Sequence, residues 1–510
     1  MKRSPDLLRL ADTVILPGFE GTTAPDWVRR RLGGGLAGVV LFSRNVATPA
    51  QVAGLTAELR AENPGVLIGI DEEAGEVTRL EARTGSSRPG NYALGVVDDE
   101  ELTEQVARDI GRDLHAAGVN LDFAPAADVN SNPDNPVIGL RSFGADPLLV
   151  ARHTTAWIRG LQSTGVAACA KHFPGHGDTS VDSHHGVPRV GASREELAEA
   201  ELWPFLAAVR EGVRCVMTGH LLVPAYDPEL PATLSPRILT GLLRTELGFD
   251  GLIVTDGIEM AAVSGPYGIG GASALAVTAG ADAVCVGGEN ADEATMDRIR
   301  AAIVDAVTGG TLPEERLAEA AARVRALAAW VADRAPRAPS AAGDGGATAE
   351  VGLAAARRAV RITRRPGAEA VLPLTAAPHV VELAPETNLA IDKGTPWGAG
   401  EPLSKLLPGT TVTRLAEPDV TGPGALDGVS DTVLGQAADR PLVLVVRDAH
   451  RHLWQLGLVE RLLAARPDGV VVEMGLPGRT DLGVAHVATH GSARVCGQAA
   501  AEVLTGAVPE

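Results

Sequence analysis

The sequence predicts an α/β protein in which a (β/α)8 barrel, the TIM barrel, is followed by a smaller α/β sandwich domain. In the first 330 residues, short apolar runs alternate with amphipathic helical stretches. Continuous apolar runs are typical of strands buried on both faces of a parallel sheet. Eight such units fit the usual size of a (β/α)8 barrel. The runs lie at 12–19, 38–44, 66–71, 120–128, 168–173, 215–220, 252–257 and 282–288.

Polar side chains at the ends of these runs favour a barrel over an open doubly wound sheet. In a barrel, the carboxyl ends of all strands converge on one mouth, where barrel enzymes carry their chemistry. In an open sheet, the same residues would spread along an edge. The residues at these ends are Asp71, Asp122, Lys171, His172, His220 and Asp256.

A second domain is expected after a segment rich in Pro, Ala and Gly at 333–349, which is predicted to be a linker. The first domain is then 1–332 and the second 350–510. In the second domain, strands are expected at 379–385, 441–449 and 469–477, and helices around 352–361, 453–465 and 494–505.

Composition excludes several classes of protein. The net charge of −19 disfavours a nucleic-acid partner, because an acidic surface repels phosphates. No apolar run approaches the roughly 20 residues that span a membrane, and the N-terminus lacks the apolar core of a signal peptide. The four cysteines form no C-x-x-C pair and are expected to be buried thiols. The sequence therefore predicts a cytoplasmic protein without a membrane partner.

The densest polar segment is KHFPGHGDTSVDSHHG, at 171–186. One interpretation is a metal site, although the spacing does not match a helical H-x-x-x-H pair and Lys171 would lie unfavourably beside a cation. Another is an Asp–His dyad, in which Asp182 orients the imidazole of His184 for proton transfer near neutral pH. A purely structural loop is the third.

A carboxylate ends the run in LIVTDGIEM, at 252–260. Asp256 could cap the following helix. It could also point into the barrel mouth as a nucleophile that works with a separate acid–base group, as in a retaining glycosidase. In the second case, a histidine would replace the usual second carboxylic acid.

Four segments together resemble bacterial glycoside hydrolase family 3, in its two-domain β-N-acetylglucosaminidase (β-N-acetylhexosaminidase) branch. The resemblance covers 10–330 well, and the second domain more weakly through RDAHRH and VVVEMGLP. The four segments are KHFPGHGDTSVDSHHG, VTDGIEM, GIDEEAGEVTRL and NPVIGLRSFGADP.

The resemblance implies a retaining exo-glycosidase that releases terminal β-linked N-acetylglucosamine from cell-wall-derived or chitin-like saccharides. Asp256 would form the glycosyl–enzyme intermediate, and His184, oriented by Asp182, would act as general acid and then as general base. No metal or organic cofactor is implied, and the chain would be a monomer or a homodimer. The sugar would be bound by Asp71, Arg79, Arg141, Lys171 and His172.

Two departures from the family pattern leave the aglycone preference and a strictly muropeptide substrate open. Where the family segment has Arg and Gly, this chain has Glu76 and Ala74, while Asp71 and Arg79 are kept. A histidine acid–base would not repel an anionic acceptor, so a phosphorylase that uses inorganic phosphate is one alternative. A β-glucosidase is a second, and a carbohydrate-binding protein that has lost catalysis is a third.

Other residues have two interpretations each. Asp122 and His220 either line the pocket or serve structure. Arg447, with Asp448 and His450, either forms a surface ion pair or reaches over the barrel mouth. Trp157 and Trp203 lie on amphipathic helices and are expected in the core. 

Overall fold

A computed structural model describes residues 4–180, 186–288, 292–334, 345–368 and 371–507. The chain divides into two compact units. The first comprises 1–73 and 100–343, and the second comprises 74–99 and 344–510. Residues 74–99 therefore lie between two barrel strands in the sequence but belong to the second unit. The expected boundary at the 333–349 segment stays a prediction.

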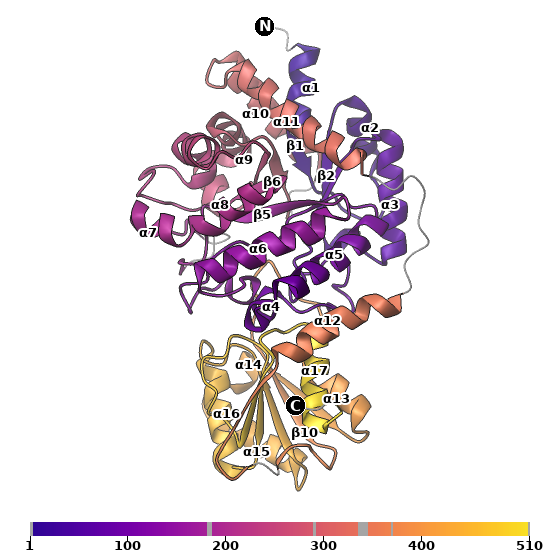
Figure 1. The fold of residues 1–510 in the computed structure, drawn as a ribbon, viewed down its shortest axis with the longest axis vertical. Coiled ribbons are helices and arrows are strands. Elements are labelled where there is room, and N and C mark those ends of the chain that lie inside the picture. Colours follow the sequence, from indigo (N-terminus) through magenta and orange to yellow (C-terminus); the bar gives the residue numbers. More distant parts are fainter. Residues whose placement is uncertain (1–3, 181–185, 289–291, 335–344, 369–370, 508–510) are drawn as a thin grey trace. The chain divides into compact units, whose positions relative to one another are not determined.

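Every expected run of the first unit contains a parallel strand, and the predicted (β/α)8 barrel is confirmed (Figure 1). Six strands pair in chain order from β2 to β7, and β1 pairs with β8. A bridge between Val254 and Ala283 connects β7 to the residues before β8. The strands are β1 (Ile15–Pro17), β2 (Gly38–Leu41), β3 (Leu67–Ile70), β4 (Leu121–Asp122), β5 (Ala167–Phe173), β6 (Cys215–Thr218), β7 (Leu252–Thr255) and β8 (Val284–Val286).

Helices follow the barrel strands, as the alternating pattern predicts. The principal ones are α1 (Pro5–Thr13), α2 (Asp26–Gly34), α3 (Pro49–Glu62), α5 (Glu100–Ala116), α6 (Pro147–Gln162), α7 (Arg194–Glu199), α8 (Leu202–Glu211), the π-helix η4 (Arg237–Glu246), α9 (Ala261–Ala279), α10 (Glu293–Thr308) and α11 (Glu314–Ala332). Short 3-10 turns are η1 (Ser43–Asn45), η2 (Gly139–Arg141) and η3 (Ala232–Leu234). None of the helices among the described residues is long and apolar enough to cross a membrane.

Helix α6 shows how local sequence sets these elements. The carboxylate of Asp146 accepts hydrogen bonds from the backbone N–H groups of Leu148 and Leu149, which caps the first turn. The apolar face of the helix buries Trp157 completely, as expected. Trp203 on α8 is 39% exposed, so its assignment to the core was wrong. A single large apolar side chain at the surface is common, since polar atoms cannot cover a whole protein.

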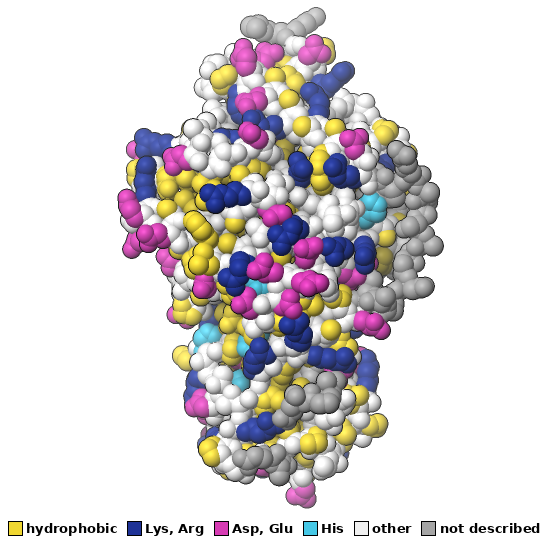
Figure 2. Space-filling model, viewed as in Figure 1, with side chains coloured by type: hydrophobic (Ala, Val, Ile, Leu, Met, Phe, Trp, Pro, Cys, Tyr) yellow, Lys and Arg dark blue, Asp and Glu magenta, His cyan; other side chains and the backbone are white. Residues whose placement is uncertain are grey.

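The surface of α5 and α6 carries both signs of charge despite the net charge of −19 (Figure 2). Glu104 on α5 pairs with Arg108 of the same helix and with Arg159 on α6. Arg152 on α6 pairs with Glu100 on α5. The acidic excess is therefore partly balanced locally on this face.

The second unit contains a six-stranded sheet in the order β11-β10-β12-β13-β14-β9, in which only β9 is antiparallel to its neighbour. The α/β sandwich is thus confirmed, with three strands that the sequence analysis did not anticipate: β9, β11 and β14. The strands are β9 (Arg361–Arg364), β10 (His379–Ala384), β11 (Thr411–Ala416), β12 (Leu442–Val446), β13 (Val470–Glu473) and β14 (Ala485–Ala488).

Helices cover both faces of this sheet (Figure 1). Alternate strand residues pack on opposite faces: Val443 and Val445 face the layer of α12, α13 and α17, whereas Leu442 and Leu444 face α14, α15 and α16. The helices are α12 (Gly345–Ala359), α13 (Gly400–Leu406), α14 (Glu417–Val420), α15 (Ala425–Ala437), α16 (Leu453–Ala465) and α17 (Arg494–Thr505).

Residues 74–99, with α4 (Asn91–Val97), pack against the α12 side of this sandwich. Gly352 on α12 approaches the backbone of Ser87 so closely that an added Cβ would lie 2.0 Å from its carbonyl oxygen. Arg358 on the same helix donates to Asp99 at 2.7 Å. Glycine at 352 is therefore required for this packing.

Candidate active site

Two partly exposed carboxylates stand at the carboxyl ends of barrel strands. Asp71 follows β3, and Asp256 follows β7. The backbone N–H of Gly257 donates to Asp256 Oδ1 at 2.7 Å, which fixes this carboxylate at the strand end. This is the position that the sequence analysis expected for Asp256.

The buried thiol of Cys285 lies on β8, in the same barrel. Burial raises its pKa, and the carboxylates of Glu259, Asp71 and Asp256 raise it further, while Lys171 opposes them. In a closed barrel, the carboxyl ends of the parallel strands lie at one mouth. The barrel therefore brings Asp71, Lys171 and Asp256 to a common mouth.

Lys171 on β5 joins two carboxylates. Its ammonium donates to Asp71 Oδ1 at 2.7 Å and lies 2.6 Å from Glu73 Oε1. Its side chain is only 2% exposed, as is that of Glu73, whereas that of Asp71 is 20% exposed. The ammonium is thus an internal link, and Asp71 is the member of this cluster that reaches the surface of the mouth.

Arg141 completes the cluster from the opposite side of Glu73. Its Nε donates to Oε2 at 2.9 Å and its Nη2 to Oε1 at 2.7 Å, a bidentate pair. Burial alone would raise the pKa of the Glu73 carboxyl, but the charges of Arg141 and Lys171 outweigh it and hold that pKa below its usual range. The two cations and the two carboxylates of Asp71 and Glu73 balance each other.

The tautomer of His172 follows from its two neighbours. Arg141 Nη2 lies 3.2 Å from His172 Nε2, and an arginine can only donate. Nε2 therefore accepts, and Nδ1 carries the proton toward Asp128 Oδ2, 2.8 Å away. The buried Asp128 also accepts from the backbone N–H groups of His172 and His176. Its carboxylate thus fixes both the ring and the start of the loop that follows β5.

Asp122 and His220, which the sequence analysis assigned either to the pocket or to a structural role, both form hydrogen bonds with the backbone. Asp122 accepts a hydrogen bond from the N–H of Glu72 at 2.9 Å, which anchors the segment between Asp71 and Glu73. His220 Nε2 lies 2.9 Å from the carbonyl oxygen of Gly257, to which it must donate. Each side chain therefore supports a neighbour of an expected site carboxylate.

The structure brings together four of the residues expected at the site: Asp71, Arg141, Lys171 and His172. Arg79 belongs to the second unit, and its expected contact with sugar stays a prediction. The dyad of Asp182 and His184 lies outside the described residues.

Glu73 and Asp128 were missed as site residues. Glu73 stands in the quoted segment GIDEEAGEVTRL, and Asp128 ends one of the apolar runs. Their positions were available as signals, but the side chains that each one holds in place come from distant parts of the chain. Within the described ranges, no three His, Cys, Asp or Glu side chains form a group that could hold a metal ion.

Comparison with known proteins shows the family to which this barrel belongs. The family described as "Glycosyl hydrolase family 3 N terminal domain" matches residues 23–327, more than half of the chain. The chain belongs to glycosyl hydrolase family 3. This confirms the family that the sequence motifs resemble.

Members of the family with similar sequences are β-hexosaminidases. The chain is 35% identical over 316 residues to "Beta-hexosaminidase A" of Pseudoalteromonas piscicida, covering 57% of this chain and 53% of that protein. It therefore spans about half the length of that relative. It is 38% identical over 267 residues to the "Beta-hexosaminidase" of Neisseria meningitidis serogroup C (strain 053442), covering 51% and 73%.

One solved structure is similar over both units. It is described as a glycoside hydrolase family 3 beta-N-acetylglucosaminidase from Paenibacillus sp. str. FPU-7. Its TM-score is 0.87 at 36% sequence identity, and the match covers 98% of this chain and 97% of that one. The two-unit architecture is thus shared with a member of the same family.

Proposed function

We propose that the chain is a retaining exo-β-N-acetylhexosaminidase acting on terminal β-linked N-acetylglucosamine. The observation that carries the proposal is that Asp256 and Asp71 follow barrel strands at their carboxyl ends, where Asp71 contacts Lys171 at 2.7 Å. Family membership and the β-hexosaminidase relatives support the substrate class. The source of the sugar would be cell-wall fragments or chitin-like saccharides.

In the first step, a carboxylate oxygen of Asp256 bonds to the anomeric carbon while the bond from that carbon to the leaving oxygen breaks. His184 in its charged form gives its proton to the leaving oxygen. In the second step, the oxygen of a water molecule bonds to the anomeric carbon and Asp256 is released. His184, oriented by Asp182, takes the proton from that water.

The buried cluster would position the sugar rather than move protons. Asp71 has a partly exposed carboxylate that can accept from sugar hydroxyls, and Lys171 holds it in place. His172 and Arg141 are fixed by Asp128 and Glu73 in the same way. A site with few remaining rotamers binds substrate at low entropic cost.

The test compares turnover of an aryl β-N-acetylglucosaminide with that of the matched aryl β-glucoside, with and without phosphate. We expect faster release of the phenol from the N-acetylglucosaminide, with free N-acetylglucosamine as the product. Preference for the glucoside would contradict the substrate class. Formation of sugar 1-phosphate at saturating phosphate would show that the reaction is phosphorolysis and not hydrolysis. Sugar binding without turnover would indicate a binding protein.

A further inference from the structure

The sheet of the second unit has a reversal in its strand order. β10 lies between β11 and β12, so the chain leaves β10 toward one edge and then returns to pair on its other side. In open parallel sheets, ligands bind in the crevice that forms at the carboxyl ends of the strands at such a reversal. A cavity of about 260 Å³ lies at this position in the second unit. 

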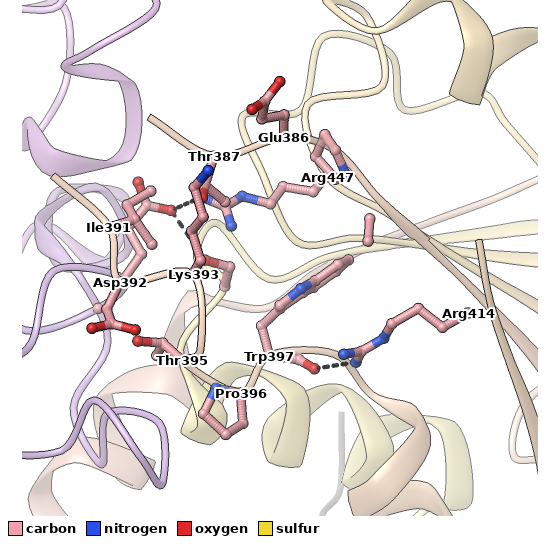
Figure 3. Close-up of a pocket in the computed structure, with 15 residues that line it drawn as sticks. Glu386, Thr387, Ile391, Asp392, Lys393, Thr395, Pro396, Trp397, Arg414 and Arg447 are labelled. Carbon is pink, nitrogen blue, oxygen red and sulfur yellow. Dashed lines mark hydrogen bonds and ion pairs between the residues drawn. The ribbon is translucent and has the colours of Figure 1, made fainter. Parts of the chain in front are cut away.

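The cavity is lined by the segment that follows β10 and by the residue that follows β12 (Figure 3). Trp397, Ile391 and Pro396 supply apolar surface. Lys393, Glu386 and Asp392 add charged groups. Figure 3 shows Trp397, Lys393 and Arg447 near one another, with the carboxylates of Glu386 and Asp392 pointing away from the indole.

The first of two arginines in the lining is neutralised. Arg447 pairs with Glu76, and Ser492 Oγ donates to the same carboxylate at 3.1 Å. The side chains of Arg447 and Glu76 are 7% and 10% exposed, so Arg447 forms a buried ion pair with a residue that the sequence analysis did not name as its partner. Glu76 is the residue that departs from the arginine of the family pattern, and here it balances an arginine of its own unit.

The second arginine is neutralised by a different carboxylate. Arg414 Nη2 donates to Glu382 Oε2 at 2.6 Å and to the carbonyl oxygen of Trp397 at 2.9 Å. Glu382 Oε1 accepts from the N–H of Gly400, the first residue of α13. The carboxylate therefore already occupies the position that an anion would take. This arrangement disfavours a phosphate or another anionic ligand.

The other charged groups are the ammonium of Lys393 and the carboxylates of Glu386 and Asp392, of which Asp392 Oδ1 accepts from the backbone N–H of Gly394 at 2.8 Å. Such a mixed set recognises hydroxyl groups, because carboxylates accept from them and an ammonium donates to them. The Arg414 guanidinium lies over the Trp397 ring, 5.5 Å from its centroid, and the indole surface that lines the cavity is apolar, as a sugar ring requires of its partner. We propose that this cavity is a second saccharide site, which binds a neutral pyranose within the second unit.

The proposal goes beyond the proposed glycosidase, since every residue that lines the cavity belongs to the second unit. The volume is slightly below the usual range for small-molecule pockets, which suits one sugar ring. The site would hold a saccharide without cleaving it.

The test is isothermal titration calorimetry of the full chain with N-acetylglucosamine at millimolar concentration. We expect two binding events per chain, of which Asp71→Ala removes one. In the Asp71→Ala background, Trp397→Ala should remove the other, whereas Trp203→Ala, at an exposed tryptophan of the first unit, should leave it unchanged. The proposal is overturned if Asp71→Ala alone removes all binding, or if the remaining event survives Trp397→Ala.

A second variant covers the case in which Trp397→Ala disturbs the core against which Trp397 packs. Lys393 is exposed, so Lys393→Ala should fold normally and weaken the remaining event by about tenfold, as expected for loss of a charge-assisted hydrogen bond. N-acetylmuramic acid, which adds a carboxylate, should bind this site more weakly than N-acetylglucosamine. Equal or tighter binding of the acid would refute a neutral ligand.

Discussion

Both units place charged side chains at the carboxyl ends of parallel strands, but they connect the charges differently. In the closed barrel, the strand ends converge, and Lys171 and Arg141 share one carboxylate, that of Glu73. In the open sheet, Arg447 and Arg414 have separate partners on either side of a cavity. Closure of a sheet therefore makes charges interdependent, whereas an open sheet keeps its ion pairs local.

The largest expected effect comes from the barrel mouth. Asp256→Ala removes the proposed nucleophile and should lower kcat for an aryl β-N-acetylglucosaminide by about three orders of magnitude or more. Steady-state kinetics checks this, with Asp250→Ala at an exposed residue before β7 as the control. Turnover of Asp256→Ala within tenfold of the parent would refute the assignment.

The carboxylate of Glu73, which Lys171 and Arg141 share, offers the next test of the comparison between the barrel and the open sheet. Glu73→Gln leaves Lys171 and Arg141 buried with less compensation, so the free energy of unfolding should fall by about 3–5 kcal/mol. Glu76→Gln in the second unit weakens the pairing of one arginine, Arg447, so the free energy of unfolding should fall by less than in Glu73→Gln. Urea unfolding measures both, and an equal or larger loss in Glu76→Gln would contradict the idea that closure makes charges interdependent.

Each unit also contains a buried glutamic acid with a raised pKa. Burial, and then the carboxylates of Asp128 and Asp178, raise the pKa of Glu201 to about 8. Burial, and then the carboxylate of Asp448, raise the pKa of Glu473 to about 8. Both groups thus keep their proton in the folded chain at pH values where an exposed glutamate has lost it.

The raised values predict a fall in stability with rising pH. Below pH 4.5, both the folded and the unfolded chain bind these protons, and the stabilisation is complete. Between pH 4.5 and about 8, the unfolded chain releases them while the folded chain keeps them, so the free energy of unfolding decreases. Above about pH 8, the loss is complete.

Glu201→Gln and Glu473→Gln should each reduce this pH dependence, because glutamine does not titrate. The free energy of unfolding of each variant minus that of the parent should be larger at pH 9 than at pH 5, by an amount on the order of a few kcal/mol at most. Denaturant unfolding at the two pH values measures the difference. Glu199→Gln, at an exposed residue of α7, is the control. An unchanged pH dependence in both buried variants would contradict the prediction.

The smallest effect is expected on the surface of α5 and α6. Glu104→Gln weakens pairs with Arg108 and Arg159, whose side chains are partly exposed. Solvent screens such pairs, so the free energy of unfolding should change by about 1 kcal/mol or less. Thermal unfolding in low and high salt checks this, and a loss as large as that of Glu73→Gln would be inconsistent with it.

The barrel strands could be predicted because each is a short run buried on both faces. The strands missed in the second unit lack that signal. β9 and β11 are edge strands that contain exposed residues, and the buried β14 is interrupted by the polar His486. A strand that is half-exposed or interrupted by a polar residue has no continuous apolar run, and its pairing depends on neighbours far along the chain.

Candidate site residues could be named from the sequence where an ionisable side chain coincides with a strand end. Asp71, Lys171 and Asp256 met that condition. Glu73 did not, because its role depends on Arg141, 68 residues away. Asp128 likewise gains its role from His172, 44 residues away. Sequence shows which residues can ionise, but the identity of their buried partners is decided by the fold.

Residues 74–99 have a consequence for synthesis on the ribosome. They emerge before barrel strand β4, yet their partners in α12 and beyond, such as Gly352 and Arg358, are made hundreds of residues later. At about 5–20 residues per second, the segment waits roughly ten seconds or longer for the second unit. During that interval, the nascent barrel carries an unfinished insertion between β3 and β4. Chaperone dependence should therefore concentrate there, and a chain cut after the barrel would leave this insertion permanently without its packing partners.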